Sequence, residues 1–218
     1  MKFFIWALLF LFLLTIQAAA QQPDQDDNQI WHETILTILL TEQVNLTFNG
    51  GLRFGFDAER FVDQRAGFGF SYKVNKYFAV STGYLYRKTE FVPGRKNYEN
   101  RLIGNFILRH TFGKIDLSDR NQFEYQARNS RSDKFNYRNR LQIERETSIK
   151  GFKIKPFASA EVFYDSQFEA FSRLRLIAGA GRKFNKNLTL DAYYLRQQDG
   201  QSRPGDLNVF GTTLRIHL

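Results

Sequence analysis

Side chains suited to acid–base or nucleophilic chemistry are scarce in this sequence. It has three histidines, His32, His110 and His217, and no cysteine, so any nucleophile would be a serine or threonine that a histidine activates. The serines that could share a wall with His110 are Ser71, Ser81 and Ser118. Their spacing yields no convincing dyad, and neither clustered histidines nor a calcium-loop spacing occurs. We therefore expect no catalytic residues, no metal site and no cofactor.

Arginine has the most distinctive distribution among the charged residues. Arginines and acidic residues recur at every second position of several segments, which places them on one face of a strand. The planar guanidinium group binds carboxylates in a bidentate manner and stays charged when it is partly dehydrated. We expect this face to line the lumen of a barrel. Its predicted polar lining is Arg53, Arg65, Arg87, Arg101, Arg109, Arg120, Arg128, Arg138, Arg140, Arg173, Arg175 and Arg215, with Glu99, Glu124, Glu144, Glu161 and Asp191.

Two roles fit this polar face. Its charges could pair into a salt-bridged plug that rigidifies a narrow barrel, because unpaired buried charges are prohibitive in free energy. The alternative is a narrow anion-preferring conduit or pocket, since twelve arginines against five acidic residues leave a positive excess for water, counter-anions or an anionic solute. In either case Arg140→Leu is expected to leave an acidic neighbour unpaired, at a cost of about 3 to 5 kcal/mol if the pair is buried.

The hydrophobic pattern that must position these residues has a period of two rather than 3.6. In residues 44–56, for example, Leu46, Phe48 and Leu52 alternate with Thr47, Asn49 and Arg53. Eleven segments follow such a pattern, and the predicted strands are 30–40, 44–56, 64–74, 77–87, 98–112, 115–128, 135–146, 152–163, 172–183, 188–197 and 207–218.

Strand length and loop pattern favour a membrane barrel. Most predicted strands have eleven residues or more, whereas globular strands average about 5 to 6 and tilted membrane strands need about 9 to 11. Short turns alternate with longer connections near 57–63, 88–97, 129–134, 164–171 and 198–205, as in outer-membrane barrels. Aromatic residues near the predicted strand ends could lie at the headgroup level. These residues are Tyr72, Tyr77, Phe112, Phe135, Phe152, Phe163, Tyr164 and Phe184.

The predicted fold is therefore all-β, a single antiparallel up-and-down transmembrane β-barrel of 10 to 12 strands. Bacterial barrels normally have an even number of strands with both termini in the periplasm, which eleven strands do not allow. Segment 30–40 fits a full wall strand least well, because residues such as Ile35 and Leu36 place apolar groups on both of its faces. We expect either ten strands from Val44 to Leu218 or twelve, with a slight preference for twelve.

The chain termini predict export to the outer membrane. Lys2 precedes an apolar run over residues 3–16, and three alanines at 18–20 then match a signal-peptidase site before Gln21. The expected organisation is a cleaved signal peptide at 1–20, a flexible N-terminal segment at 21–29 and a barrel at 30–218. The final strand alternates to Leu218 and resembles the terminal signal that the barrel assembly machinery reads, although Phe is commoner at the last position.

Composition predicts one domain with a net positive charge that attracts anionic partners. The chain has 218 residues, 43% of them hydrophobic and 16% aromatic, which suffices for one domain of ordinary size. Its 31 Lys and Arg against 22 Asp and Glu give a net charge of +9, so phospholipid headgroups, lipopolysaccharide or nucleic acid would be attracted. Because the protein is expected to be exported, binding to nucleic acid is not expected.

Several motifs resemble a known bacterial family. They are Gly83-Tyr84-Leu85-Tyr86, Glu99-Asn100-Arg101, Arg138-Asn139-Arg140 with Glu144, Glu161-Val162-Phe163, and Arg173-Leu174-Arg175 followed by Gly179 and Tyr194. Together they are similar to the family catalogued as domain of unknown function 2490, over nearly all of the chain after residue 20. The resemblance implies an outer-membrane β-barrel of Gram-negative bacteria, with no established substrate or catalytic residues.

Two classes of function remain open at this point. The first is a non-enzymatic outer-membrane barrel, either a small anion-preferring channel or a structural protein of the envelope. The second is an outer-membrane enzyme acting on lipid or lipopolysaccharide, which would need a Ser/His/Asp cluster at one membrane depth. A soluble periplasmic lipocalin-like barrel is a third possibility. The expected partners are outer-membrane lipid and lipopolysaccharide, the barrel assembly machinery during insertion, and a small anionic solute.

Overall fold

Alternating apolar and polar residues form long strands throughout the chain. The structure is a computed structural model that describes residues 26–149, 152–202 and 205–218, so the expected signal peptide lies outside the described residues. No described segment is a helix long and apolar enough to cross a membrane. The strands are β1 (Asp27–Leu39), β2 (Val44–Gly55), β3 (Arg60–Lys73), β4 (Phe78–Val92), β5 (Arg95–Phe112), β6 (Ile115–Arg128), β7 (Lys134–Arg145), β8 (Thr147–Ile149), β9 (Phe152–Asp165), β10 (Ala170–Lys183), β11 (Leu188–Asp199) and β12 (Leu207–His217).

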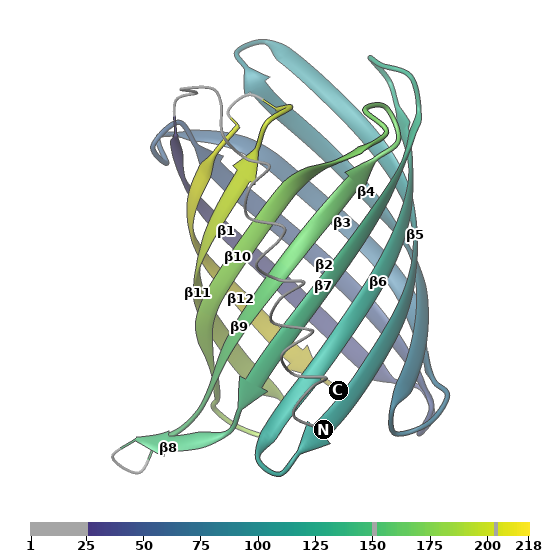
Figure 1. The fold of residues 1–218 in the computed structure, drawn as a ribbon, viewed down its shortest axis with the longest axis vertical. Helices are drawn as coiled ribbons and strands as arrows, with labels where there is room; N and C mark the ends of the chain where they lie inside the picture. The colour runs from purple at the N-terminus through teal and green to yellow at the C-terminus, as the bar shows by residue number, and fades with distance from the viewer. Residues whose placement is uncertain (1–25, 150–151, 203–204) are drawn as a thin grey trace, which may run out of the picture.

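Eleven of these strands close into a barrel (Figure 1). Neighbouring wall strands pair antiparallel from β1 round to β12, and β7 pairs directly with β9. The three-residue strand β8 pairs only with the start of β9, so this short hairpin projects from one end of the wall (Figure 1). Closure comes from β1 and β12, which run parallel over eleven residue pairs from Asp27 with Leu207 to Thr37 with His217.

The parallel pair corrects the expected strand number. All eleven segments predicted from periodicity are wall strands, and the barrel has neither ten nor twelve of them. The argument for an even number assumed antiparallel closure throughout. Because β1 and β12 run in the same direction, the wall begins at one end of the barrel and finishes at the other.

The prediction that segment 30–40 is not a full wall strand was also wrong. It forms the full wall strand β1, with ten residue pairs to β2 in addition to its parallel pairs with β12. Ile35 of β1 lines the lumen, while Leu36 has the opposite parity and faces outward. Both faces of β1 therefore carry apolar residues, and Ile35 is paired in register with Asn49 of β2 and Arg215 of β12.

The two ends of the barrel differ less in loop length than expected. We call the end with connections 40–43, 74–77, 113–114 and 184–187 the turn end, and the opposite end, with connections 56–59, 93–94, 129–133, 166–169 and 200–206, the loop end. Predicted long loops near 57–63 and 88–97 are largely strand, because β3 begins at Arg60 while β4 and β5 extend to Val92 and from Arg95. Strand pairing absorbs these polar residues into the wall.

The outer wall is apolar, as a membrane-spanning barrel requires. Large side chains such as Phe48, Leu102 and Phe210 are exposed there. Six of the eight aromatics predicted near strand ends are also exposed, while Tyr164 is half-buried and Phe163 is buried. Phe163 is only 6% exposed, because its parity points it into the lumen rather than toward lipid.

The loop-end half of the lumen contains the main apolar cluster. Trp31, Ile177, Leu195, Leu207 and Val209 form this cluster, which we call the Trp31 cluster. Tyr193 packs against it, and Gly211 makes room for the phenol ring, since a Cβ atom at Gly211 would lie only 2.1 Å from Tyr193 Cζ. One side of the lumen is thus filled by hydrocarbon.

Candidate functional site

The other side of the lumen is filled by ion pairs, beginning at Asp63 of β3. This carboxylate is 1% exposed, and its Oδ2 lies 2.6 Å from Arg65 Nη2 and 2.7 Å from Arg87 Nη2. Arg53 Nη1 of β2 lies farther away, at 3.7 Å from the same oxygen. Parity explains the grouping, because Asp63 is paired in register with Arg53 on one side and lies next to the Arg65–Arg87 pair on the other.

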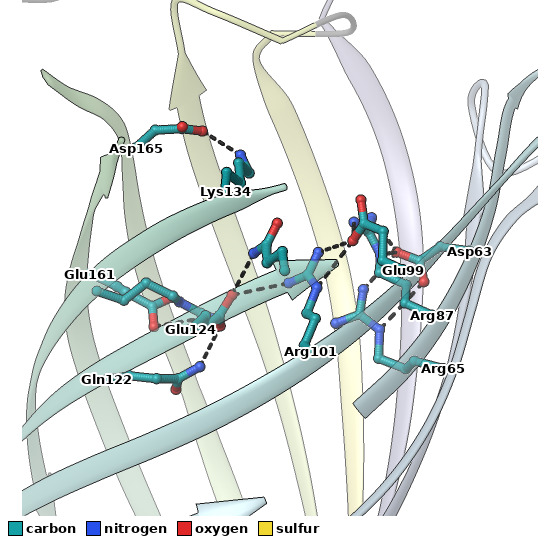
Figure 2. A network of polar contacts seen from close by, with 12 residues as sticks. Asp63, Arg65, Arg87, Glu99, Arg101, Gln122, Glu124, Lys134, Glu161 and Asp165 are labelled. Atoms are coloured by element: carbon teal, nitrogen blue, oxygen red, sulfur yellow. Dashed lines mark hydrogen bonds and ion pairs between the residues drawn. The ribbon is translucent and has the colours of Figure 1, made fainter. Parts of the chain in front are cut away.

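The chain of ion pairs continues across β5 and β6 (Figure 2). Arg87 Nη1 lies 3.3 Å from Glu99 Oε2, and Glu99 also accepts a hydrogen bond from Arg101 Nε at 3.0 Å. Arg101 Nη1 then reaches Glu124 Oε2 at 3.2 Å, and Glu124 Oε1 lies 2.7 Å from Arg138 Nη1. Arg87 and Arg101 therefore each link two carboxylates on different strands.

Glu161 of β9 completes the chain. Its Oε1 accepts hydrogen bonds from Arg120 Nη2 at 2.8 Å and from Arg138 Nη2 at 2.9 Å. Its Oε2 lies 3.7 Å from Arg175 Nη1 of β10. We call the whole set the ion-pair belt; its members are Asp63, Glu99, Glu124, Glu161, Arg53, Arg65, Arg87, Arg101, Arg120, Arg138 and Arg175.

The belt is deeply enclosed and carries excess positive charge. Glu124 and Glu161 are only 1% and 2% exposed, so their charges depend on the arginines around them. Seven arginines share four carboxylates in the belt. Cation–π contacts with aromatic rings stabilise some of the arginines. Arg53 Cζ lies 3.4 Å from the centre of the Trp31 ring, and Arg175 Cζ lies 4.6 Å from the centre of the Phe163 ring.

Two further pairs lie on the loop side of the belt. Lys134 of β7 contacts Asp165 of β9 (Figure 2), and Arg173 Nη2 of β10 lies 2.5 Å from Asp199 Oδ2 of β11. All four residues belong to strand segments next to loop-end connections. The belt, these pairs and the Trp31 cluster together fill the loop-end half of the lumen.

The turn-end half contains a cavity of about 1480 Å³. Its lining reaches the short turns at Lys76 and Asn185, and its roof is the turn-facing side of the belt. Within the described part of the chain, the lining includes thirteen Lys and Arg side chains but only seven Asp and Glu. None of the loop-side residues Lys134, Asp165 or Asp199 lines it. We call this space the turn-side cavity.

The structure places most of the predicted polar residues around this cavity. Those that line it are Arg53, Arg65, Arg101, Arg109, Arg120, Glu124, Arg138, Arg140, Glu144, Glu161, Arg175, Asp191 and Arg215. Arg87 and Glu99 lie within the belt and Arg173 on its loop side. Arg128 has the same parity as Glu124 but does not line the cavity, and its Nε donates to Ser132 O in the adjoining loop at 2.9 Å.

Arg140 does not have the acidic partner that was expected. Within the described residues it makes no ion pair, and its Nε donates to Ser159 Oγ at 3.2 Å. Its register partner Glu161 is already shared by Arg120, Arg138 and Arg175. The expectation that Arg140→Leu strands an acidic residue is therefore wrong.

Sequence reasoning missed Asp63 of the belt and the loop-side residues Lys134, Asp165 and Asp199. It also missed charged residues that line the turn-side cavity, which are Glu33, Lys76, Asp116, Glu146, Lys153, Lys155 and Lys183. Asp63 fell within a predicted loop, although continuing the alternation back from Arg65 would have placed both side chains on one face. Lys134, Asp165 and Asp199 fell in predicted connections, one or two residues beyond the predicted strand ends, where strand limits are hardest to locate. Asp63 is the most consequential omission, because three arginines converge on it.

The candidate catalytic residues form no hydrogen-bonded dyad among the described residues, although His110 and Ser118 both line the turn-side cavity. Ser71 accepts a hydrogen bond from Asn45, and Ser81 accepts one from Asn105. The His110 ring packs against Tyr77 and Phe112, and no hydrogen bond joins it to a serine among the described residues. Nor does any group of three or more His, Asp or Glu side chains there have the arrangement of a metal site.

A polar cluster on the outer wall also escaped the sequence analysis. Asp119 and Asn121 of β6 and Tyr137 and Asn139 of β7 have the outward parity, yet they form hydrogen bonds with one another. Asn139 Nδ2 donates to Asp119 Oδ1 at 2.6 Å, and Tyr137 OH donates to Asn121 Oδ1 at 2.6 Å. These bonds satisfy groups that hydrocarbon would leave unpaired.

Residues 28–208 match the family model described as protein of unknown function, DUF2490. The chain belongs to the DUF2490 family. The closed barrel agrees with an outer-membrane barrel family, and the ion-pair belt of this DUF2490 protein lies entirely within the matched residues. No curated protein sequence matches it.

Two solved structures resemble this DUF2490 barrel. LpxR from Salmonella typhimurium has 9% sequence identity and a TM-score of 0.52, with 80% of this chain and 83% of that chain covered. The anion-selective porin from Comamonas acidovorans has 15% identity and a TM-score of 0.39, with 78% of this chain and 55% of that chain covered. At these identities the first likeness concerns the fold alone.

Proposed function

We propose that this protein is a non-enzymatic outer-membrane barrel that holds small anions in its turn-side cavity. The observation that supports the proposal is the lining of the cavity, in which thirteen cationic side chains face seven acidic ones. Such an excess within a low-dielectric wall attracts anions and repels cations. The turn end would face the periplasm, from which anions enter.

The proposal distinguishes a blind chamber from an open pore. The belt joins eight strands, β2 to β7, β9 and β10, while the Trp31 cluster fills the lumen beside the remaining strands. Passage of an ion through the loop-end half would require these buried pairs to separate. Their separation costs free energy, whereas an open pore needs no such rearrangement. We therefore expect anion binding without steady conduction.

Charge preference in the cavity can be tested with a single cysteine, because the native chain has none. Thr47 lines the cavity, so Thr47→Cys in detergent micelles should react several-fold faster with a sulfonate thiol reagent than with a quaternary ammonium reagent of similar size. Ser132→Cys in an exposed loop is the control and should show a much smaller preference. Equal rates for the two reagents at position 47, or a faster cationic reagent, would overturn the anion preference.

Conduction needs a separate measurement. In planar lipid bilayers under a potassium chloride gradient, the wild-type barrel is expected to show no steady current. A steady anion-selective current would show that the barrel is an open channel rather than a chamber closed at one end. A cation-selective current would overturn the proposal.

A further inference from the structure

Two arginines oppose each other directly on the lumen face of β6 and β7. Arg120 is the register partner of Arg140, and both side chains line the turn-side cavity. Like charges directly opposite on one face of an antiparallel pair destabilise it. This cross-strand pair therefore requires negative charge close to both guanidinium groups.

The protein supplies only part of that charge. Glu161 reaches Arg120 at 2.8 Å, but the same carboxylate also serves Arg138 at 2.9 Å and Arg175 at 3.7 Å. Within residues 26–149, 152–202 and 205–218, Arg140 has no carboxylate at ion-pair distance, and its hydrogen bond to Ser159 Oγ is to a neutral group. Three arginines thus share Glu161, and among the described residues only Arg138 has a second carboxylate, Glu124.

The hydrogen-bonding capacity of this group is also incompletely used. Arg120 Nε and Arg138 Nε are buried and have no hydrogen-bond partner in the part of the chain that the structure describes. A buried charged donor without an acceptor is costly, and native proteins usually satisfy it with water or an ion. Both donors belong to side chains that line the cavity, so an acceptor that enters from the turn end can approach them.

We propose that Arg120 and Arg140 together bind a doubly charged phosphate group, either inorganic phosphate or a phosphate monoester. Guanidinium groups bind phosphate oxygens in a bidentate manner, and two forks can hold one tetrahedral group from two sides. A dianion offsets more of the local positive excess than a monovalent carboxylate does. The site rests on the proposed anion-binding function and names its ligand class.

Isothermal titration calorimetry of the purified barrel in detergent micelles, at constant ionic strength, tests the site. Inorganic phosphate and glycerol 3-phosphate should each bind saturably at one site, and acetate should bind at least tenfold more weakly. Arg140→Gln should weaken phosphate binding at least tenfold. Its unfolding midpoint without phosphate should equal or exceed that of the wild type, because the cross-strand repulsion is removed.

Arg109→Gln is the matched control for this substitution. Arg109 also lines the cavity and has no ion pair within the described residues, but it is paired in register with Ser118 rather than with Arg120, and β6 separates it from Arg140. This variant should keep the wild-type phosphate affinity. Absence of saturable phosphate binding, or an equal loss in both variants, would overturn the site.

The source of the phosphate group can be separated from its chemistry. Mixed micelles containing phosphatidic acid provide a lipid headgroup, and soluble phosphate provides the free ion. If either one raises the unfolding midpoint of the wild type but not that of Arg140→Gln, the result supports the site and identifies the source of the phosphate group. If Thr47→Cys prefers the anionic reagent but neither source binds, the phosphate site fails while the proposed anion-binding function stands.

Discussion

At the scale of single residues, Glu161 determines how the lumen distributes its charge. It is 2% exposed and is shared by Arg120, Arg138 and Arg175, so its removal leaves three enclosed cations with less compensation. Truncating one partner of a buried pair is costly chiefly because the other charge stays behind. The same sharing explains why Arg140 has no carboxylate of its own.

Glu161→Gln should therefore lower the free energy of unfolding by about 3 to 5 kcal/mol. The change keeps the side chain's size and removes only its charge. Urea unfolding in micelles, followed by heat-modifiable gel mobility, measures the effect. Glu33→Gln is the control, because Glu33 lines the same cavity without an ion pair in the described part of the chain. Equal midpoints for the two variants would contradict the central role of Glu161.

At the scale of elements, close approach between strands and lumen side chains depends on particular glycines. Gly211 of β12 lies beneath the Tyr193 ring, and a Cβ atom there would come within 2.1 to 2.4 Å of two ring carbons and the hydroxyl oxygen of Tyr193. Gly104 of β5 has the outward parity, and a Cβ atom at this position would have no neighbouring atom within 4 Å among the described residues. The same residue type therefore has opposite packing constraints on the two faces of the wall.

Gly211→Ala should destabilise the barrel by about 1 to 3 kcal/mol, because the added methyl group displaces the Tyr193 ring from the Trp31 cluster. Gly104→Ala should leave the unfolding midpoint nearly unchanged. Combining Gly211→Ala with Tyr193→Leu should recover part of the loss, since the clashing ring is absent. An effect of Gly104→Ala as large as that of Gly211→Ala would refute this assignment of the two faces.

At the scale of the whole molecule, the parallel seam sets the barrel's polarity. It places Ile30 of β1 beside Phe210 of β12, near the loop end, and Leu36 beside Ile216, near the turn end. An antiparallel closure would bring Ile30 toward Ile216 instead. The direction of a single strand pair thus decides at which end the wall begins.

Disulfide formation can establish this direction, because the native chain has no cysteine. Ile30→Cys combined with Phe210→Cys should cross-link on mild oxidation of the folded barrel, since the two residues are register partners. Ile30→Cys combined with Ile216→Cys should remain reduced. The reverse pattern would show that the seam is antiparallel.

Export is the other property of the whole molecule that can be tested. We expect cleavage before Gln21, which would leave β1 intact because this strand starts at Asp27. Intact-mass measurement of the protein from purified outer membranes checks both location and cleavage. A mass that retains residues 1–20, or recovery from the soluble periplasm, would contradict the expectation.

The sequence by itself determined the local elements of this protein. Alternation of side chains identified all eleven wall strands, because a strand with one wet and one apolar face has a period of two. The same alternation assigned Arg53, Glu124 and Glu161 to the lumen face. These properties depend only on neighbouring residues in the chain.

Only the tertiary structure decided the closure and the charge partners. Strand direction at the seam depends on how β1 meets β12, which lies about 180 residues away in sequence and has no local signature. The choice of partners for Asp63 and Glu161 depends on register across several strands, since carboxylates are shared among whichever arginines come within reach. For this reason Arg140 forms no ion pair among the described residues: its parity was evident from sequence, but the competition for Glu161 exists only in the closed barrel.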